Sequence, residues 1–240
     1  MPKRADNAIS VFPDPELANE DGLLAIGGDL EVETLHEAYS LGIFPWPQAD
    51  LPMLWFSPRE RGVMDFDRLH ISKSLSKTIS KSQWRWTWNQ EFEKVIKACA
   101  KAPRPGQLGT WITPEMLKAY IRFHEAGHAH SLECWADERL VGGIYGTYVR
   151  GVFSGESMFH LVPNASKVAL VTLIQFLEYA GLKWMDTQMV TSVIEKMGAH
   201  VIARKDFLRR VRVAHKSKIE LGAKQFADFL HDRKKSRGDD

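Results

Sequence analysis

The chain has 240 residues, of which 44% are apolar, so it is long enough to bury a core as one large domain or slightly more. Its 32 Lys and Arg residues against 30 Asp and Glu residues give a net charge of only +2, which excludes affinity for polyanions through net charge alone. Only Cys99 and Cys134 are present, without a CxxC spacing, which favours a reducing compartment over secretion.

The first sixty residues are rich in turn formers, among them Asp21-Gly22, Gly27-Gly28 and Ser57-Pro58. Turn-forming residues at this density leave room for one clear helix, from about Val32 to Leu41. We therefore predict a small, loop-rich N-terminal domain over residues 1–61.

Beyond this point the apolar periodicity predicts alternating strands and helices. A strand near Gly62 to Phe66, a helix from Ser72 to Lys81 and a strand over Trp84 to Trp88 come first. The alternating tryptophans of that last strand should share one face. A helix with a threonine cap and an early proline should then run from Thr113 to Gly127.

The pattern then changes to three consecutive strands with short turns, an antiparallel meander over His130–Asp137, Leu140–Arg150 and Gly151–Glu156. Asn164 can cap an apolar helix that ends at Ala180, where Gly181 suits a left-handed exit. The remaining elements are predicted as strand Leu182–Thr187, helix Ser192–Met197 and strand His200–Arg204.

This order resembles the core of GNAT acyltransferases, a likeness of fold that proves no chemistry. We predict an α+β fold, with the small N-terminal domain followed by a GNAT-like acyltransferase domain over residues 62–232. Residues 233–240 should form a basic, disordered tail.

Three polar residues stand out as candidates for chemistry. Glu156 lies among glycines and apolar residues in a predicted strand, which favours a buried carboxylate, although a solvated turn acid fits equally. Asp186 and Gln188 lie two apart at the end of a strand, so their side chains should share one face. A carboxylate beside an amide can orient that amide or hold an attacking amine. Hydrogen bonding to a neighbouring loop is the alternative.

Histidines 124, 128 and 130, with Cys134 nearby, allow a zinc hypothesis. Their spacing lacks a convincing fourth ligand, and they straddle a predicted helix end and strand start, so we expect no metal. The chain has no G-x-S-x-G, P-loop or H-E-x-x-H motif, which excludes the usual hydrolase and nucleotide-binding signatures.

Positive charge is clustered although the net charge is small. Residues 59–104 hold eleven Lys and Arg against five Asp and Glu, and residues 204–237 hold twelve against four. Such clusters can hold a nucleic-acid backbone, or they can be a solvated surface with a basic tail. Met1 to Asn7 lack the charged-then-apolar pattern expected of a leader, and the apolar stretch Ala165 to Gly181 is short and interrupted by polar residues. We therefore expect a cytoplasmic protein without a membrane span.

Taken together, nine segments resemble the motif series of the leucyl/phenylalanyl-tRNA–protein transferases. They match in order, with plausible spacing, between about Phe12 and Arg210. The segments are Gly22–Leu30, Tyr39, Gly42–Trp46, Leu54–Pro58, Gly109–Ile112, His130–Glu133, Gly155–Phe159, Asn164–Lys167 and Asp186–Gln188.

The resemblance implies a bacterial cytosolic enzyme that transfers Leu or Phe, and Met less readily, from aminoacyl-tRNA to acceptor proteins that begin with Arg or Lys. The product would carry an N-terminal degradation signal. On the same grounds Glu156, Asp186 and Gln188 would form the polar centre, while Trp46, Trp111 and Tyr39 would lie at the terminal adenosine. The amino-acid pocket would be shaped by Ile144, Phe153, Met158, Leu170, Leu173 and Met185.

No cofactor is expected, because an aminoacyl ester is already activated, and a monomer is the default. Asp186 should orient Gln188 and attract the ammonium group of the acceptor. Two other functions remain as alternatives. An acetyl-CoA-dependent N-acetyltransferase is disfavoured, because the central helix opens with a proline and no glycine for pyrophosphate. A non-enzymatic tRNA-binding module would also explain basic clusters with aromatics.

Overall fold

The computed structural model describes residues 10–48, 50–103 and 110–237. Arg104, Gly109 and the last three residues of the predicted tail, all used in the sequence analysis, lie outside the described residues. In chain order the elements are η1 (Pro15–Leu17), β1 (Leu23–Ile26), α1 (Val32–Ser40), β2 (Phe44–Pro45), β3 (Leu54–Phe56), β4 (Glu60–Asp65), η2 (Phe66–Arg68), α2 (Lys73–Lys81), β5 (Arg85–Trp88), α3 (Phe92–Lys101), α4 (Pro114–Glu125), β6 (Ala129–Ala136), β7 (Arg139–Val149), β8 (Val152–His160), α5 (Ala165–Tyr179), β9 (Trp184–Gln188), α6 (Ser192–Glu195), β10 (His200–Ala203), α7 (Arg204–Ala214) and α8 (Ala223–Arg237).

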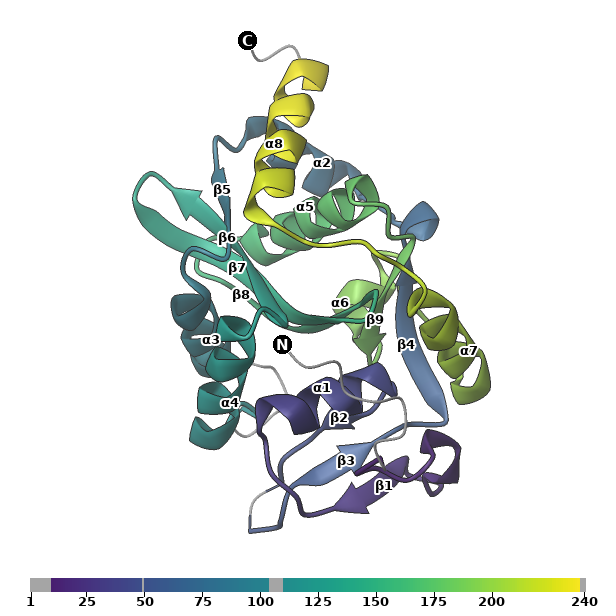
Figure 1. Ribbon diagram of the computed structural model, residues 1–240. Coiled ribbons are helices and arrows are strands. Elements are labelled where there is room, and N and C mark those ends of the chain that lie inside the picture. The colour runs from purple at the N-terminus through teal and green to yellow at the C-terminus, as the bar shows by residue number, and fades with distance from the viewer. Residues whose placement is uncertain (1–9, 49, 104–109, 238–240) are drawn as a thin grey trace.

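Two sheets organise the described residues (Figure 1). The small sheet has the order β1-β3-β2, and the large one has the order β10-β4-β9-β8-β7-β6-β5. Every neighbouring pair is antiparallel except β8 and β9, which are parallel and pair at one register point, Ser154 with Asp186. Beyond that point β8 continues to His160 without pairing to β9, so the two strands diverge. The divergence opens the sheet at the end of β9.

Helix α5 packs on one face of the large sheet and is buried on nearly every side, with eleven of its fifteen side chains inside the protein. Helices α2 and α8 cover its outer side (Figure 1). The cover is aromatic, since the ring of Phe176 lies 5.0 Å from that of Phe226 and 5.6 Å from that of Phe229. This explains why α5 is apolar all round rather than along one stripe.

The other face is covered by α1, α3 and α4, which share one hydrophobic core. Leu35 and Tyr39 of α1 belong to the same buried cluster as Val95 of α3, Phe123 of α4 and Tyr145 of β7. Helix α7 packs separately along β4, through Phe207 and Leu208 among others. Residues of the predicted N-terminal domain are therefore packed directly on the larger sheet.

The predicted α+β fold is confirmed, including the meander, the buried helix and the strand, short helix and strand that follow it. Gly181 has the positive φ expected at the helix exit, 108°. Asn164 stands at the N-cap position, but its side chain does not cap α5 and instead donates to Thr78 Oγ1 at 3.3 Å. We find no helix among the described residues with the length and hydropathy to cross a bilayer.

Three helices and the small sheet were missed by the sequence analysis. Helix α3 is amphipathic, with Phe92, Val95, Ile96 and Cys99 buried, but it lies inside a basic run that we interpreted by charge alone. Helices α7 and α8 lie in the second basic run, residues 204–237, and were missed for the same reason. Helix α8 extends to Arg237, and its last turn thus includes residues 233–237 of the segment that the sequence assigned to the tail.

Candidate active site

A cavity of about 280 Å³ opens where β8 and β9 diverge. Polar groups from the middle of β8 and the end of β9 meet in it with apolar groups from β7 and α5. Its lining consists of Trp46, Trp111, Ile144, Gly155, Glu156, Ser157, Met158, Leu170, Met185, Thr187, Gln188, Met189, Thr191 and Ile194. Eight of the twelve residues predicted from the sequence are in this set.

Glu156 is the carboxylate of the cavity. Its Oε1 accepts hydrogen bonds from the phenol of Tyr39 at 2.7 Å and from Nε2 of Gln188 at 2.8 Å. The side chain keeps partial contact with the cavity but is densely surrounded by protein, and this burial raises its pKa to about 7. Near neutral pH the carboxyl group of Glu156 is therefore present both in the ionised form, which only accepts hydrogen bonds, and in the protonated form, which can also donate one. The solvated-turn alternative is wrong for this residue.

Two tyrosines extend the hydrogen-bond chain behind Glu156. The hydroxyls of Tyr39 and Tyr120 are hydrogen-bonded to each other, and Tyr39 gives its only proton to Glu156, so Tyr120 must be the donor to Tyr39. Burial, followed by the charge of Glu156, raises the pKa of each phenol well above its usual value. Both therefore remain donors at neutral pH. Tyr39 lies behind Glu156 and does not line the cavity.

Asp186 is held by an ion pair that the sequence analysis missed. Arg61 donates from Nε and Nη2 to the two carboxylate oxygens, at 2.8 and 2.7 Å, and each side chain is 1% exposed. Ser154 Oγ and the backbone N–H of Gln188 also donate to this carboxylate, at 2.9 and 2.8 Å. The rings of Phe44 and Phe207 enclose the guanidinium, at 4.6 and 4.4 Å. Asp186 is thus buried beneath the cavity with both oxygens occupied.

This geometry contradicts the expectation that Asp186 attracts the ammonium group of an acceptor, because a fully paired and buried carboxylate cannot reach it. Asp186 does hold Gln188, through the backbone rather than through the amide. The two side chains bond to Ser154 and Glu156, which are themselves two apart on β8. They therefore lie on the same face of the sheet, as their spacing predicted.

Gln188 ends β9 in an unusual conformation, with a φ of 58°. Its partner in the adjacent strand is Gly62, where the register shifts. A Cβ on Gly62 would lie 2.8 Å from the backbone of Met189 and from Thr187 Oγ1, so only glycine lets the strands approach this closely. At this close approach the amide of Gln188 donates to Glu156.

The apolar part of the cavity contains four of the six residues predicted for an amino-acid pocket, namely Ile144, Met158, Leu170 and Met185. Phe153 and Leu173, each 1% exposed, belong to the core behind it and do not line it. Thr191 and Ile194 of the α6 segment do line it and were not predicted, because nothing in their local sequence marks them.

Trp46 and Trp111 stand at one end of the cavity with their rings stacked on each other, 5.5 Å apart and inclined by 19°. They come from the segment after β2 and from the segment before α4, so only the tertiary fold joins them. A flat aromatic platform of this kind can stack a nucleobase.

The zinc hypothesis finds no support in the histidine positions. His124 stacks on Phe92 with its ring 4.2 Å away, while His130 contacts the amide of Asn89 at 2.9 Å through Nδ1. Within the described ranges no three His, Cys, Asp or Glu side chains are placed to hold a metal ion.

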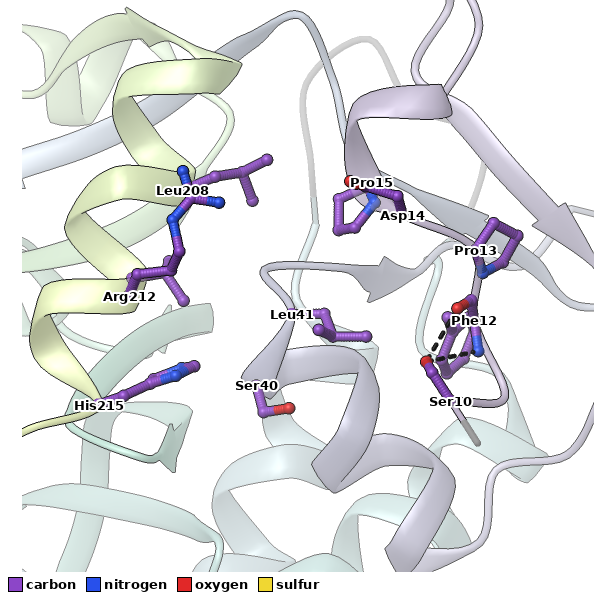
Figure 2. A pocket seen from close by; sticks show the side chains of 11 residues that line it. Ser10, Phe12, Pro13, Asp14, Pro15, Ser40, Leu41, Leu208, Arg212 and His215 are labelled. Atoms are coloured by element: carbon purple, nitrogen blue, oxygen red, sulfur yellow. Dashed lines mark hydrogen bonds between the residues drawn. The ribbon is translucent and has the colours of Figure 1, made fainter. Parts of the chain in front are cut away.

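A second hollow of about 340 Å³ lies elsewhere, between the segment Ser10–Pro15, the end of α1 and helix α7. Figure 2 shows Arg212 of α7 and His215, the residue after that helix, facing Ser40 and Leu41 across it. No predicted site residue lines this hollow, so we place the candidate active site in the cavity at the end of β9.

Comparison with known proteins gives one consistent result. The family model described as leucyl/phenylalanyl-tRNA protein transferase matches residues 63–212, and the model of the N-terminal domain of that family matches residues 28–59. A leucyl/phenylalanyl-tRNA–protein transferase of Anaeromyxobacter is 50% identical over 83% of this chain and 85% of the relative. Proteins of the same name from Hydrogenovibrio crunogenus and Myxococcus xanthus are 50% and 44% identical, over 84% and 91% of this chain and 80% and 93% of theirs.

Among solved structures the similarity is weak. L-PGS from Bacillus licheniformis is 13% identical with a TM-score of 0.38, over 67% of this chain and 51% of that one. A functionally unknown conserved protein from Staphylococcus epidermidis is 9% identical with a TM-score of 0.37, over 75% and 68%. Similarity of this degree says nothing about chemistry.

Proposed function

Because the chain belongs to the leucyl/phenylalanyl-tRNA protein transferase family of aminoacyltransferases, we propose that it transfers Leu or Phe, and Met less readily, from aminoacyl-tRNA to the N-terminal Arg or Lys of acceptor proteins. The new peptide bond marks the acceptor for degradation through its N-terminus. One observation carries the proposal at the level of the site. The paired Glu156 and Gln188 share a single cavity with an apolar pocket and a tryptophan platform.

The reaction needs positioning more than activation, because the ester that links an amino acid to tRNA is already reactive toward amines. Holding ester and amine in attack geometry supplies about 7 to 11 kcal/mol in the best intramolecular models. General base catalysis adds less, roughly a hundred- to ten-thousand-fold in rate. The cavity therefore acts by excluding water and aligning the two reactants.

These residues of the cavity divide between two parts of the aminoacyl-tRNA, the terminal adenosine and the amino acid esterified to it. Trp46 and Trp111 stack on the terminal adenosine of the tRNA, and Ile144, Met158, Leu170 and Met185 enclose the amino-acid side chain. An apolar pocket rich in methionine is flexible and offers no partner to a hydroxyl or a charge. It therefore accepts Leu, Phe and Met. Phe153 and Leu173 support this wall from behind.

Gln188 is the group that meets the attacking amine. Its Nε2 is engaged by Glu156, which leaves the amide oxygen to accept a hydrogen bond from the amine. Tyr39 and Tyr120 hold Glu156, while Asp186 and Arg61 hold the backbone of Gln188. Proton removal is a secondary contribution.

The partners that follow are aminoacyl-tRNA and proteins with an N-terminal Arg or Lys. A cytoplasmic monomer is consistent with these partners, because charged tRNA and newly exposed protein N-termini meet in the cytoplasm. The division into an N-terminal domain over residues 1–61 and a catalytic domain over residues 62–232 belongs to the same proposal. Arg61 then stands at the boundary and pairs across it.

The test is a dipeptide-forming assay with Phe-tRNA and a peptide that begins with Arg. The expected product is Phe joined to the Arg amine, without added nucleotide or cofactor. Acetylation of the same peptide from acetyl-CoA would instead support an N-acetyltransferase. Binding of Phe-tRNA without any transfer would support a tRNA-binding module and refute the proposal.

A further inference from the structure

A third cavity lies on the other side of α6 from the candidate active site. It has a volume of about 240 Å³ and is lined by polar and basic side chains, chiefly His70, Ser72, Asn164, Lys167, Ser192 and Lys196. Of the described residues that line it, none is an Asp or a Glu. A concave, water-accessible site with ammonium and hydroxyl donors and no carboxylate matches a phosphate group.

The two lysines are available to a ligand. Lys167 is partly buried on the first turn of α5 and reaches Asn164 Oδ1 at 3.4 Å, while Lys196 is exposed at the end of α6. Neither takes part in an ion pair within the described part of the chain. Their charges converge from two elements on one cavity and are not neutralised there.

The cavity shares a wall with the candidate active site. Thr191 and Ile194 line the aminoacyl cavity, whereas Ser192, Val193 and Lys196 of the same short segment line this one. An α-helix with its side chains is about 10 to 12 Å across. A ligand here would thus lie roughly one helix diameter from the reacting ester. The single-stranded 3′ end of tRNA carries a phosphate at each nucleotide, so its backbone can reach that far.

We infer that this cavity binds a backbone phosphate near the 3′ end of the aminoacyl-tRNA, with Lys167 and Lys196 as its cations. The inference rests on the proposed function and adds an interaction that carries no sequence information. Such an interaction orients the strand and thereby directs the ester toward Gln188.

The experiment compares two acyl donors in transfer to an Arg-starting peptide. Phe-tRNA carries the phosphates, whereas 3′-O-phenylalanyl adenosine carries the ester and base but no phosphate. The variants are Lys196→Glu and the milder Lys167→Gln. Lys183→Glu is the matched control, because it makes the same charge change at an exposed lysine before the other end of β9. Each is measured over a range of salt concentrations.

We expect Lys196→Glu and Lys167→Gln to raise the KM for Phe-tRNA several-fold. In a plot of the logarithm of the binding constant against the logarithm of the salt concentration, each variant should also reduce the slope by roughly one unit for every phosphate that it no longer holds. The same variants should leave transfer from the phosphate-free donor unchanged, and Lys183→Glu should leave both unchanged. An equal loss with both donors, or an equal loss in Lys183→Glu, would overturn the inference.

Free phosphate is the other source of the same chemistry. A change in transfer from the phosphate-free donor on adding millimolar inorganic phosphate, seen in the wild type and abolished by Lys196→Glu, would make the cavity an effector site and overturn the assignment to tRNA. Failure of the wild type to use either donor would refute the proposed function itself, and the inference with it. If the wild type is active but Lys196→Glu and Lys167→Gln behave like Lys183→Glu, only the phosphate site is refuted.

Discussion

Replacing Asp186 by alanine should damage both the stability and the transfer rate of the enzyme, for two different reasons. The substitution removes the partner of a guanidinium that is 1% exposed and pairs through two bonds, at 2.7 and 2.8 Å. Losing one member of a buried pair typically costs about 3 to 5 kcal/mol, because the remaining charge stays buried and unpaired. The free energy of unfolding should fall by that amount, which is a large share of the roughly 5 to 15 kcal/mol of a typical protein.

The rate should fall because Gln188 loses the 2.8 Å bond from its backbone N–H to the carboxylate. A shift of about 1 Å in a positioned group can cost about a hundredfold in rate. Asp186→Asn leaves Arg61 unneutralised, so this variant should be destabilised as well. Because it preserves the volume and one hydrogen-bond acceptor, its transfer rate should fall less than that of Asp186→Ala. Urea unfolding gives the first quantity, and single-turnover transfer from saturating Phe-tRNA gives the second.

A double variant, Arg61→Met with Asp186→Leu, separates the two effects. Replacing both charges by apolar groups of similar size is often neutral for stability. The double variant should therefore regain most of the unfolding free energy and none of the rate. A loss of less than about 1 kcal/mol in Asp186→Ala would mean that the ion pair does not carry the role we assign to it. Recovery of the rate in the double variant would show that Asp186 does not position Gln188.

Four further predictions concern the cavity. The transfer rate should rise with pH through about 7 as Glu156 becomes the carboxylate that holds Gln188, and Glu156→Gln should remove this step from the pH–rate profile while leaving the one due to the acceptor amine. The pKa of Glu156 is about 7 in the folded state, above the ordinary 4.5, so the free energy of unfolding should fall as the pH rises between those values. Urea unfolding of the wild type and of Glu156→Gln over this pH range would measure the difference. Trp111→Ala should weaken Phe-tRNA binding by roughly 1 to 3 kcal/mol, with Trp111→Phe retaining most of the affinity; equal binding by all three proteins in a filter-binding assay would exclude stacking. Leu and Phe should be transferred in preference to Ile and Val by roughly 10- to 200-fold in kcat/KM, a discrimination that rests on shape alone, so comparable use of Ile and Leu would refute the pocket.

The elements around the site could largely be predicted from the sequence, because their signals are local. The apolar run of Val168 to Leu177, the turn residues of the meander and the cap at Thr113 each act within a few positions. The spacing of two between Asp186 and Gln188 was sufficient to place them on one face. In α3 and α7 the apolar pattern was not recognised, because each helix buries only a few side chains among many charged ones. Prediction from apolar spacing failed there.

By itself, then, the sequence determined the α+β class and the order of the core elements, and it selected Glu156 and Gln188 as candidate polar residues. Only the tertiary structure decided that Asp186 is neutralised by Arg61, 125 positions earlier in the chain, and that Tyr120 stands behind Tyr39, 81 positions away from it. Local pattern can assign a side chain to a face of its own element, but its partner depends on which distant element packs against that face. That choice is made by burial of the whole core, and it turned Asp186 from a group that meets substrate into one that supports Gln188.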